Sequence, residues 1–443
     1  MKFFCKINQD ISSTSEILSK LHTMSGLVFL KDQNYPVIAF NPNHYLIYKN
    51  NQFSFFKINS EKQYEMMDEF AIDSLLQFDS SQNHPVFTQF QGGYIGFVSY
   101  DYAAKQFTSV RERPQPAFYL GRYESFLKQQ EDGWYFYSHA DDAEQQFIQL
   151  RTLLSQPITI EELELTQACH PRWSKSEYAN AFQQIQNYIV AGDCYQINLT
   201  QEFTAKGQGS LLSRAESLWN LTDAPYAGYL KLDDFELLSC SPELFIEFKQ
   251  QQLITRPIKG TMPRFADPDL DAASKQKLQN SEKDQAENVM IVDLLRNDLS
   301  IHAETGSVKT TKLFEIESFN QVHHMVSEIE AQLKSEVNPF DVLMSALPGG
   351  SITGAPKIRA MQIIEELEGG SRGAYCGSLG YFNFDGSGRW NILIRSIQKF
   401  QDELSIWAGG GITIASDCEA EYQECFDKIS AMLNLLNTWQ IKN

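Results

Sequence analysis

Hydrophobic and polar residues follow two different periods along this chain of 443 residues. In the first third, aromatic residues alternate with polar ones around Phe53, Tyr119 and Trp134. A period of two is typical of strands with one face buried. The run QGGYIGFVSYD at residues 91–101 predicts a buried strand that begins with glycine. Residues 1–155 are therefore predicted to form an N-terminal region that is mostly β.

A polar connection over residues 156–173 separates this region from one with a helical period. Apolar residues recur at helical spacing from Tyr178 to Ile189, and Gly192 marks the end of that helix. The run CYQINLTQEF that follows predicts a strand. Strands then alternate with helices without the regular rhythm of a parallel sheet, which indicates an α+β fold with large antiparallel sheets. We expect residues 174–437 to form a second region that shares one compact fold with the first.

Composition excludes several classes of protein. No run of about 18 apolar residues exists, so no membrane span is predicted. The start MKFFCKINQDISS lacks the apolar core of a signal peptide. Seven cysteines, none in a C-x-x-C pair, indicate neither a disulfide framework nor a zinc site and fit a reducing cytoplasm. A formal net charge of −19 disfavours nucleic acids and anionic membranes as partners.

Two β-prone runs, LFIEF and LITRP, predict an antiparallel hairpin that turns at Gln250 and Gln251. Glu243 precedes the first strand and Lys259 follows the second, so the hairpin places the two side chains nearly opposite each other. One interpretation is a structural ion pair across two strands. The other is an amine and a carboxylate that act together in an active site.

Two segments predict helices that carry pairs of acids. Residues 281–299 begin with a serine suited to an N-cap, and Asp284 and Glu287 share one face because they are three positions apart. Residues 416–437 predict a second amphipathic helix that places three charged residues on one face, Glu421, Glu424 and Lys428.

Carboxylates without nearby cysteines suit magnesium, which keeps several waters and is usually completed by oxygens of the substrate. The alternative is that acids near helix N-termini complement the helix dipole and face water.

A glycine-rich segment, PGGSITGAPKIRAMQIIEELE from residue 348, runs into a helix that has Pro356 near its first turn. Backbone N–H groups of this loop and the positive end of the helix favour an anion. The spacing is not that of a phosphate-binding P-loop, because Ala355 follows Gly354 where a lysine is required. A plain tight turn is the alternative interpretation.

Glycines and an arginine near the C-terminus also indicate an anionic ligand. The glycines at residues 409–411 permit close approach of the backbone to a ligand. Arg395 stands among apolar residues in the strand-like run NILIRS, so it requires an anionic partner. A carboxylate bound through two hydrogen bonds is the expected partner.

The segments TRPIKGTMPR at 255–264 and SPELF around Glu243 resemble the signature of the chorismate-utilising enzymes. Further segments extend the resemblance over residues 90–435, and it is weak before residue 90. The resemblance implies antiparallel sheets that form a sandwich-like core flanked by helices. It also implies that residues 174–437 bind chorismate and hold the catalytic groups.

Roles for individual residues follow from the resemblance. Lys259 is expected to be a nucleophile that forms a covalent intermediate, and Glu243 a proton donor. His324 is expected to orient the substrate with Thr261 beside it in the catalytic group, although a histidine in such a segment is more often an ordinary core residue. Magnesium is expected on Glu287 and Glu424, with Asp284 and Glu421 as their outer neighbours.

The resemblance also assigns residues to the chorismate pocket. Gln196 stands where the water-using members of the family carry a lysine base, so this chain lacks that base. The full set expected to contact the substrate is Gln196, Gly350, Ser351, Thr353, Gly354, Tyr375, Arg395, Gly410, Gly411 and Lys428.

A lysine at position 259 implies the branch of the family that replaces the 4-hydroxyl of chorismate with ammonia, on the route to 4-aminobenzoate and folate. Two alternatives stay open: an anthranilate-forming member, which usually carries alanine there, and a non-catalytic chorismate-binding subunit. Cys376 fails the G-x-C-x-G spacing of a glutaminase nucleophile, so we expect a separate glutamine amidotransferase to supply ammonia. We expect no further fused domain after Asn443.

Overall fold

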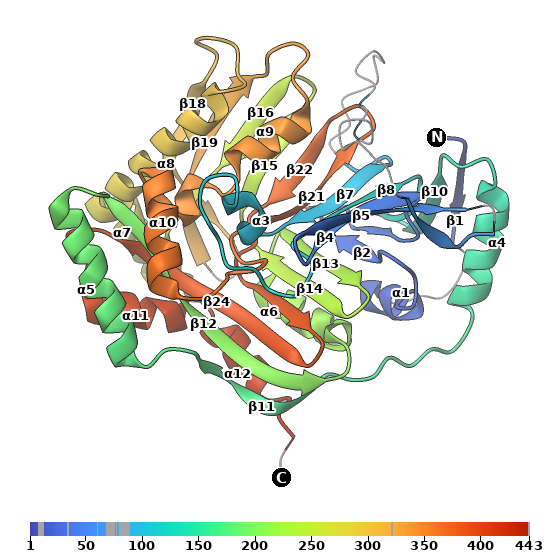
Figure 1. The fold of residues 1–443 in the computed structure, drawn as a ribbon, viewed down its shortest axis with the longest axis horizontal. Coiled ribbons are helices and arrows are strands. Elements are labelled where there is room, and N and C mark those ends of the chain that lie inside the picture. Colours follow the sequence, from blue (N-terminus) through green and yellow to red (C-terminus); the bar gives the residue numbers. More distant parts are fainter. Residues whose placement is uncertain are drawn as a thin grey trace.

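Two antiparallel sheets pack face to face, with helices on their outer faces (Figure 1). The computed structural model describes residues 1–7, 13–32, 35–59, 61–67, 76, 78, 89–319 and 322–441. In these residues each sheet has twelve strands. The α+β class and the sandwich-like core are therefore confirmed. Part of the predicted N-terminal region, residues 79–88, lies outside the described residues.

The first sheet ends in an edge strand that the sequence pattern presents as a linker. Residues 156–173 are expected to form a polar connection, yet β11 forms within them and pairs with β12. Its side chains are mostly exposed, which explains the polar pattern. In spatial order the strands are β1 (Phe3–Lys6), β10 (Gly133–Ser138), β9 (Ser125–Gln130), β3 (Val37–Ala39), β2 (Val28–Leu30), β13 (Tyr226–Leu232), β14 (Phe235–Ser241), β23 (Ser396–Phe400), β24 (Glu403–Ile412), β12 (Gln196–Gln208) and β11 (Glu164–Pro171), and β20 (Gly354–Ala355) also pairs with β12.

The second sheet contains the predicted hairpin, and N-terminal and C-terminal strands meet in it where β7 pairs with β21. In spatial order its strands are β17 (Ile258–Pro263), β19 (Val322–Gln332), β16 (Gln252–Arg256), β15 (Leu244–Lys249), β22 (Gly388–Asn391), β21 (Ser378–Asn383), β7 (Gly93–Val98), β8 (Phe118–Tyr123), β4 (His44–Lys49), β5 (Gln52–Ile58) and β6 (Tyr64–Met67), and β18 (Lys309–Ser318) also pairs with β19. Strands from residues 1–155 and 174–437 thus share both sheets.

The helices connect these strands, and none in the described part of the chain is long and apolar enough to cross a lipid bilayer. The α-helices are α1 (Thr14–Lys20), α3 (Tyr100–Ala104), α4 (Ala143–Leu154), α5 (Lys175–Ala191), α6 (Ala215–Thr222), α7 (Pro268–Gln279), α8 (Glu282–Ser300), α9 (Pro339–Ala346), α10 (Lys357–Glu368), α11 (Cys418–Asp427) and α12 (Ser430–Asn437). Two short 3-10 helices are η1 (Leu211–Arg214) and η2 (Gly350–Ile352).

Local signals in the sequence explain where two site-forming helices begin and end. The helix expected after residue 174 is α5, and Gly192 ends it in the left-handed conformation with φ of 82°. The helix expected from residue 281 is α8, whose N-cap Ser281 accepts a hydrogen bond from the N–H of Asp284.

The single helix expected over residues 416–437 is instead two helices, α11 and α12, separated near Ile429. Cys425 on α11 packs into the apolar cluster that contains α5, whereas Met432 on α12 packs into the cluster beneath the first sheet. The first cluster contains Ile197 and Ile412 of the paired strands β12 and β24, and the second contains Phe203 and Ile406 farther along the same strands. Each helix packs against its own part of the strands, and the chain breaks between them. The apolar period continues through the break, so the sequence pattern conceals it.

Candidate active site

Lys259 occupies an irregular position in strand β17. Its neighbours Ile258 and Thr261 pair with Val326 and His324 of β19, and the register shifts between them. Gly260 supplies the positive φ of 83° that this bulge requires. The Nζ atom of Lys259 lies 3.1 Å from Oε2 of Glu287, and 17% of the lysine side chain is exposed.

The structural ion pair, one of the two interpretations of Glu243 and Lys259, does not form, because the amine of Lys259 pairs with Glu287 instead. The hairpin itself is confirmed, since β15 and β16 pair and Gln250 turns with φ of 56°. After β16 the chain continues along β19 as β17, and the carboxyl group of Glu243 accepts a hydrogen bond from the backbone of Ile258 beside Lys259. Glu243 stays close enough for the charge of Lys259 to act on it.

Glu243 is a buried carboxyl group, with 7% of the residue exposed. Burial raises its pKa to about 7, although the backbone of Ile258 and the charges of Lys259, Lys428 and Arg395 oppose that rise. A carboxylic acid that holds its proton near neutral pH suits the expected role of proton donor.

Two glycines make room for three of the four predicted acids. A Cβ at Gly260 would lie 2.9 Å from Cγ of Asp284. A Cβ at Gly410 would lie 2.8 Å from Oε2 of Glu421 and 3.1 Å from Oε1 of Glu424. Strand β17 therefore meets the first turns of α8, and strand β24 meets α11, with almost no space between backbone and carboxylates.

These acids control the protonation of Lys259. Burial lowers the pKa of Lys259, but the charges of Glu287, Glu424 and Glu421 and the hydrogen bond to Glu287 outweigh burial, so the pKa lies above its ordinary value. The groups that hold the proton are thus the helix acids rather than Glu243.

Lys428 connects Glu424 on helix α11 to the backbone of strand β24. Its Nζ atom lies 2.6 Å from Oε1 of Glu424 and donates a hydrogen bond to the carbonyl of Gly409 at 2.7 Å. Burial raises the pKa of Glu424, but the charge and hydrogen bond of Lys428, with further cations, lower it below its ordinary value. Burial dominates for Glu421 and raises its pKa.

The donor set fits magnesium. Among the described residues no group of three or more His, Cys, Asp or Glu side chains has the arrangement of a complete metal site. Magnesium needs no such group, because it is usually bound by one or two carboxylates together with waters and substrate oxygens. Glu287 and Glu424, both beside Lys259, offer two carboxylates from different helices.

Arg395 lies at a break in the backbone rather than in the expected strand. It follows β22 and precedes β23, with φ of 50°. In the described part of the chain no carboxylate forms an ion pair with its guanidinium group. Burial lowers its pKa, which the charges of Cys240 and Glu243 oppose. A buried arginine without an internal partner is suited to a carboxylate of a ligand.

Thr261 and His324 face each other across paired strands. Oγ1 of Thr261 lies 2.8 Å from Nδ1 of His324. Burial and the charge of Arg395 lower the pKa of His324 to about 4, although the backbone of Gly260 opposes them. The imidazole is therefore neutral at neutral pH, and it suits an orienting role better than a proton-donating one.

The glycine-rich segment packs against the start of β12. Gly354 and Ala355 form β20 and pair with Gln196 and Ile197. Oε1 of Gln196 is buried without a hydrogen-bond partner, and a Cβ at Gly411 would lie 2.5 Å from its Nε2. An unpartnered buried amide oxygen is suited to a donor on a ligand.

The expected anion cradle of backbone N–H groups is only partly available. The N–H groups of Ile352 and Thr353 donate to Gly349 and Gly350 within the loop. Thr353 is buried and Ser351 is half-buried. The loop thus has fewer free donors than the sequence pattern indicates.

Tyr375 is buried behind the loop. Its ring stacks on Trp407 with centroids 5.8 Å apart, and the guanidinium carbon of Arg372 lies 5.7 Å from its centroid. The sequence pattern did not single out Arg372 or its ion-pair partner Glu368, although their i, i+4 spacing is a signal for such a pair. Helix α10 ends at Gly369, before Arg372, so the two residues are not on one helix and their spacing alone does not predict the pair.

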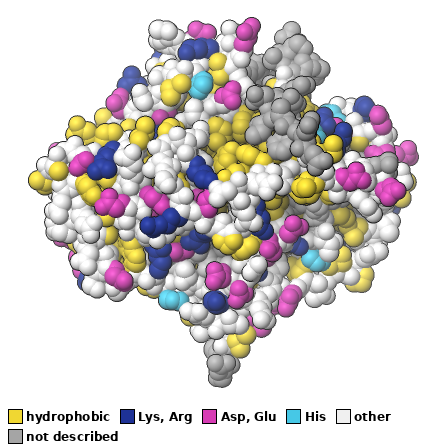
Figure 2. All heavy atoms as spheres, in the orientation of Figure 1, with side chains coloured by type: hydrophobic (Ala, Val, Ile, Leu, Met, Phe, Trp, Pro, Cys, Tyr) yellow, Lys and Arg dark blue, Asp and Glu magenta, His cyan; other side chains and the backbone are white. Residues whose placement is uncertain are grey.

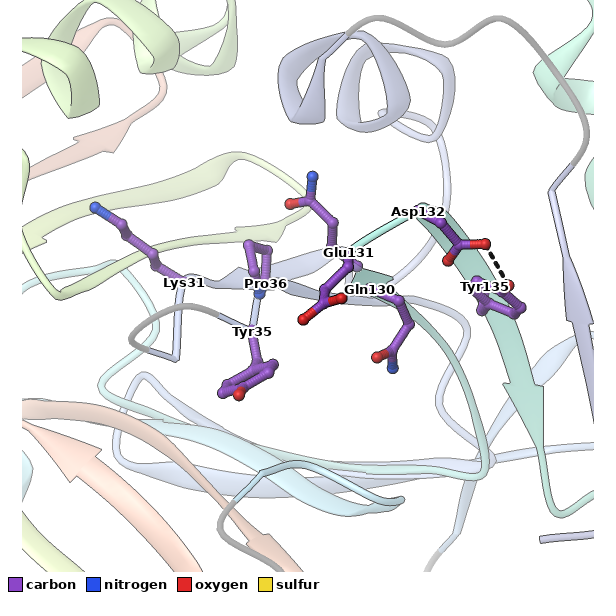
Figure 3. Close-up of a pocket in the computed structure, with 8 residues that line it drawn as sticks. Lys31, Tyr35, Pro36, Gln130, Glu131, Asp132 and Tyr135 are labelled. Carbon is purple, nitrogen blue, oxygen red and sulfur yellow. Dashed lines mark hydrogen bonds between the residues drawn. The ribbon is translucent and has the colours of Figure 1, made fainter.

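A separate pocket is formed by residues that are distant in sequence from the predicted site residues. It lies between β2, β3 and the β9–β10 turn (Figure 3). It is lined by Lys31, Tyr35, Pro36, Gln129, Gln130, Glu131, Asp132 and Tyr135. Tyr135 donates to Asp132 at 3.0 Å, the contact drawn in Figure 3. None of the predicted site residues lines this pocket, so it is not the predicted substrate site.

Comparison with known proteins identifies the family. A family model for chorismate binding enzymes matches residues 27–434, which extends the match well before residue 90. A component 1 of aminodeoxychorismate synthase from Klebsiella aerogenes is 49% identical over 62% of this chain and 61% of its own length. The corresponding protein from Salmonella typhimurium is 43% identical over 78% of this chain and 77% of its own length.

A solved structure supports the same assignment. Anthranilate synthase component I from Streptococcus pneumoniae superposes with a TM-score of 0.78, at 28% identity, and the match covers 90% of this chain and 92% of that chain. The sheets, the clustered acids and the match over nearly the whole sequence agree. The chain belongs to the family of chorismate binding enzymes.

Proposed function

We propose that this chain is aminodeoxychorismate synthase component 1, which converts chorismate and ammonia to 4-amino-4-deoxychorismate and water. The observation that carries the proposal is Lys259, which lies beside Glu287 within a cluster of acids. Support comes from the component 1 relatives, which are 43–49% identical. The product belongs to the route toward 4-aminobenzoate and folate.

In the first step the neutral amine of Lys259 attacks carbon 2 of chorismate. The ring double bond shifts and the bond between carbon 4 and its hydroxyl breaks. Glu243 gives its proton to the departing hydroxyl, which leaves as water. The burial that keeps Glu243 protonated near pH 7 supports this assignment.

In the second step ammonia attacks carbon 4 of the adduct. The bond between carbon 2 and the lysine nitrogen breaks, and its electron pair returns to Lys259 as a neutral amine. The new ammonium group returns one proton to Glu243, so the site regains its starting charges. Lys259 must be neutral when the first step begins, and Glu287, Glu421 and Glu424 oppose the loss of its proton from the resting enzyme.

Magnesium, when bound by Glu287 and Glu424, would neutralise those acids and orient the ring carboxylate of the substrate. Arg395 would bind a substrate carboxylate, because it has no ion pair in the described part of the chain. Lys428 adds positive charge on the metal side. His324, neutral and hydrogen-bonded to Thr261, would hold the substrate without transferring a proton.

Ammonia is expected from a second protein. The names of the relatives describe a component 1, which implies another component. We propose that this partner is a glutamine amidotransferase.

A cytoplasmic location is supported by the seven cysteines, all of which are free. Acidic and basic side chains are interspersed over the face seen in Figure 2, and the net charge of −19 supports small-molecule rather than nucleic-acid recognition.

The deciding experiment is to incubate the purified chain with chorismate, magnesium and an ammonium salt, and to identify the product by mass spectrometry. We expect 4-amino-4-deoxychorismate, which keeps its pyruvyl group. The variant Lys259→Ala should lose most of this activity but still bind chorismate. Anthranilate with free pyruvate would identify the chain as an anthranilate synthase component instead. No conversion at all would favour a non-catalytic chorismate-binding subunit.

A further inference from the structure

One ion pair beneath the glycine-rich loop is buried almost completely. Glu368 ends helix α10 and Arg372 follows four residues later, and they are 2% and 1% exposed. Nε and Nη2 of Arg372 donate to the two carboxylate oxygens of Glu368 at 2.8 and 2.7 Å. Burial of two charges is costly, and such a pair is often tolerated because it fixes one arrangement of the chain around it.

The pair joins three segments of the chain, one of which lies more than 140 residues before the others. Nη1 of Arg372 donates to the carbonyl of Ile352 at 3.1 Å, and Nη2 donates to the carbonyl of Asn198 at 2.7 Å. Oε1 of Glu368 accepts from the N–H and the hydroxyl of Thr200 at 3.1 and 2.6 Å. The end of α10, the turn η2 and strand β12 are therefore tied to one pair of charges.

Two of these segments, β12 and η2, carry residues of the candidate site. Strand β12 begins with Gln196, and η2 contains Gly350 and Ser351. Asn198 adds a second tie, because its side-chain amide donates to the carbonyl of Ile352 at 3.0 Å. Neither Glu368 nor Arg372 is among the residues expected to contact chorismate. The pair therefore acts on the substrate only through the residues that it holds in place.

We propose that Arg372, held by Glu368, is the positioning residue that sets the distance between the glycine-rich loop and strand β12, and with it the affinity for chorismate. This inference rests on the proposed function. The planar fork of an arginine reaches Glu368, Ile352 and Asn198 together, which the single ammonium group of a lysine does not. Looser packing of the loop against β12 weakens binding of substrate and transition state alike, which raises KM more than it lowers kcat.

The test is the variant Arg372→Lys in the full chain. We expect KM for chorismate to rise roughly tenfold, while kcat changes less than about threefold. The matched control is Arg389→Lys. Arg389 is also buried and donates twice to Glu247, at 3.0 and 2.7 Å, and once to Asp32 at 2.8 Å, but it contacts neither the loop nor β12. This control should lower the melting temperature comparably and leave KM unchanged.

A milder variant covers the case in which Arg372→Lys does not fold. Thr200→Val keeps the ion pair and its shape but removes the hydroxyl that donates to Glu368. We expect KM to rise about three- to fivefold, the size of the effect of one ordinary hydrogen bond. An unchanged KM in Arg372→Lys, or in Thr200→Val where the first variant does not fold, would overturn the proposal and leave the pair a purely structural one.

Calorimetric titration with chorismate separates this proposal from the proposed function, because it requires no turnover. If the parent chain makes another product, the proposed function fails, and the dissociation constants of the same variants still test the positioning role. Weaker binding in Arg372→Lys but not in Arg389→Lys supports it. Equal binding in both variants overturns it.

Discussion

The amine of Lys259 and the carboxylate of Glu287 lie 3.1 Å apart, and they connect strand β17 to helix α8. The contact has two consequences for chemistry. It holds Lys259 beside the acids that are suited to magnesium, and it raises the pKa of the amine above its ordinary value, against the effect of burial. A nucleophilic lysine must therefore be released from this carboxylate before it can react.

The first prediction concerns that release. Replacement of Glu287 by Gln removes the strongest charge that holds the proton, while burial remains. We expect the pKa of Lys259 to fall by at least about one unit. The pH dependence of its acetylation by acetic anhydride, followed by peptide mass spectrometry in the absence of magnesium, measures this pKa directly.

The matched control is Glu419→Gln. Glu419 lies on α11, like Glu421 and Glu424, but it is 64% exposed and pairs with Lys175 at the surface. Its removal should leave the pKa of Lys259 unchanged. If Glu287→Gln also leaves it unchanged, the ion pair does not control the proton.

Local signals explain why much of the fold could be predicted from the sequence. Ser281 caps the start of α8 with its side chain, and Gly192 ends α5 in a left-handed backbone conformation. Both signals depend on residue type, so both helices could be predicted. The break near Ile429 has no such signal, since it arises from packing against two different clusters. Strand β11 was missed because its mostly exposed side chains resemble a linker.

The candidate site was predicted less completely, because contacts between distant segments decide it. Glu243 and Lys259 are close in sequence, and the hairpin pattern suggested an ion pair between them, but the amine of Lys259 pairs with Glu287 on helix α8. Arg372 binds backbone carbonyls of Asn198 and Ile352. Backbone acceptors leave no pattern in the residue types, so only the fold shows this pair.

The second prediction is a pH dependence set by Glu243. Burial raises its pKa to about 7, so the proton that it must donate is present below that pH and is lost above it. Where bound magnesium keeps Lys259 neutral, we expect kcat to fall as the pH rises through about 7. We expect Glu243→Gln to lower kcat by roughly 10²- to 10⁴-fold and to abolish that fall. Steady-state rates between about pH 5.5 and 9 measure both effects.

Stability provides an independent check on the same group. Because the folded pKa of Glu243 exceeds the unfolded value, its contribution favours folding at low pH and is lost as pH rises from the unfolded pKa to about 7. The Gln variant carries no such charge. Its free energy of unfolding should therefore equal or exceed that of the parent above pH 7, and a lower value there would argue against a buried acid of raised pKa.

The third prediction concerns magnesium. Removal of divalent cations with a chelator should abolish turnover, and added magnesium should restore it. In Glu424→Gln we expect the magnesium concentration for half-maximal activity to rise at least roughly tenfold, because one of two protein ligands is lost. Glu419→Gln should behave like the parent, since its exposed carboxylate faces Lys175. Full activity in the chelated protein would exclude the metal assignment.

The fourth prediction uses two adjacent glycines to distinguish the metal-binding part of the site from the substrate-binding part. A Cβ at Gly410 would lie 2.8 Å from Oε2 of Glu421 and 3.1 Å from Oε1 of Glu424, so Gly410→Ala should displace these acids and raise the magnesium requirement. A Cβ at Gly411 would lie 2.5 Å from Nε2 of Gln196, so Gly411→Ala should raise KM for chorismate without changing the magnesium requirement. Both residues are in β24, and each variant controls for the strain of the other. Titrations of magnesium and of chorismate on both variants distinguish the two effects, and identical profiles would mean that the glycines serve only the packing of the strand.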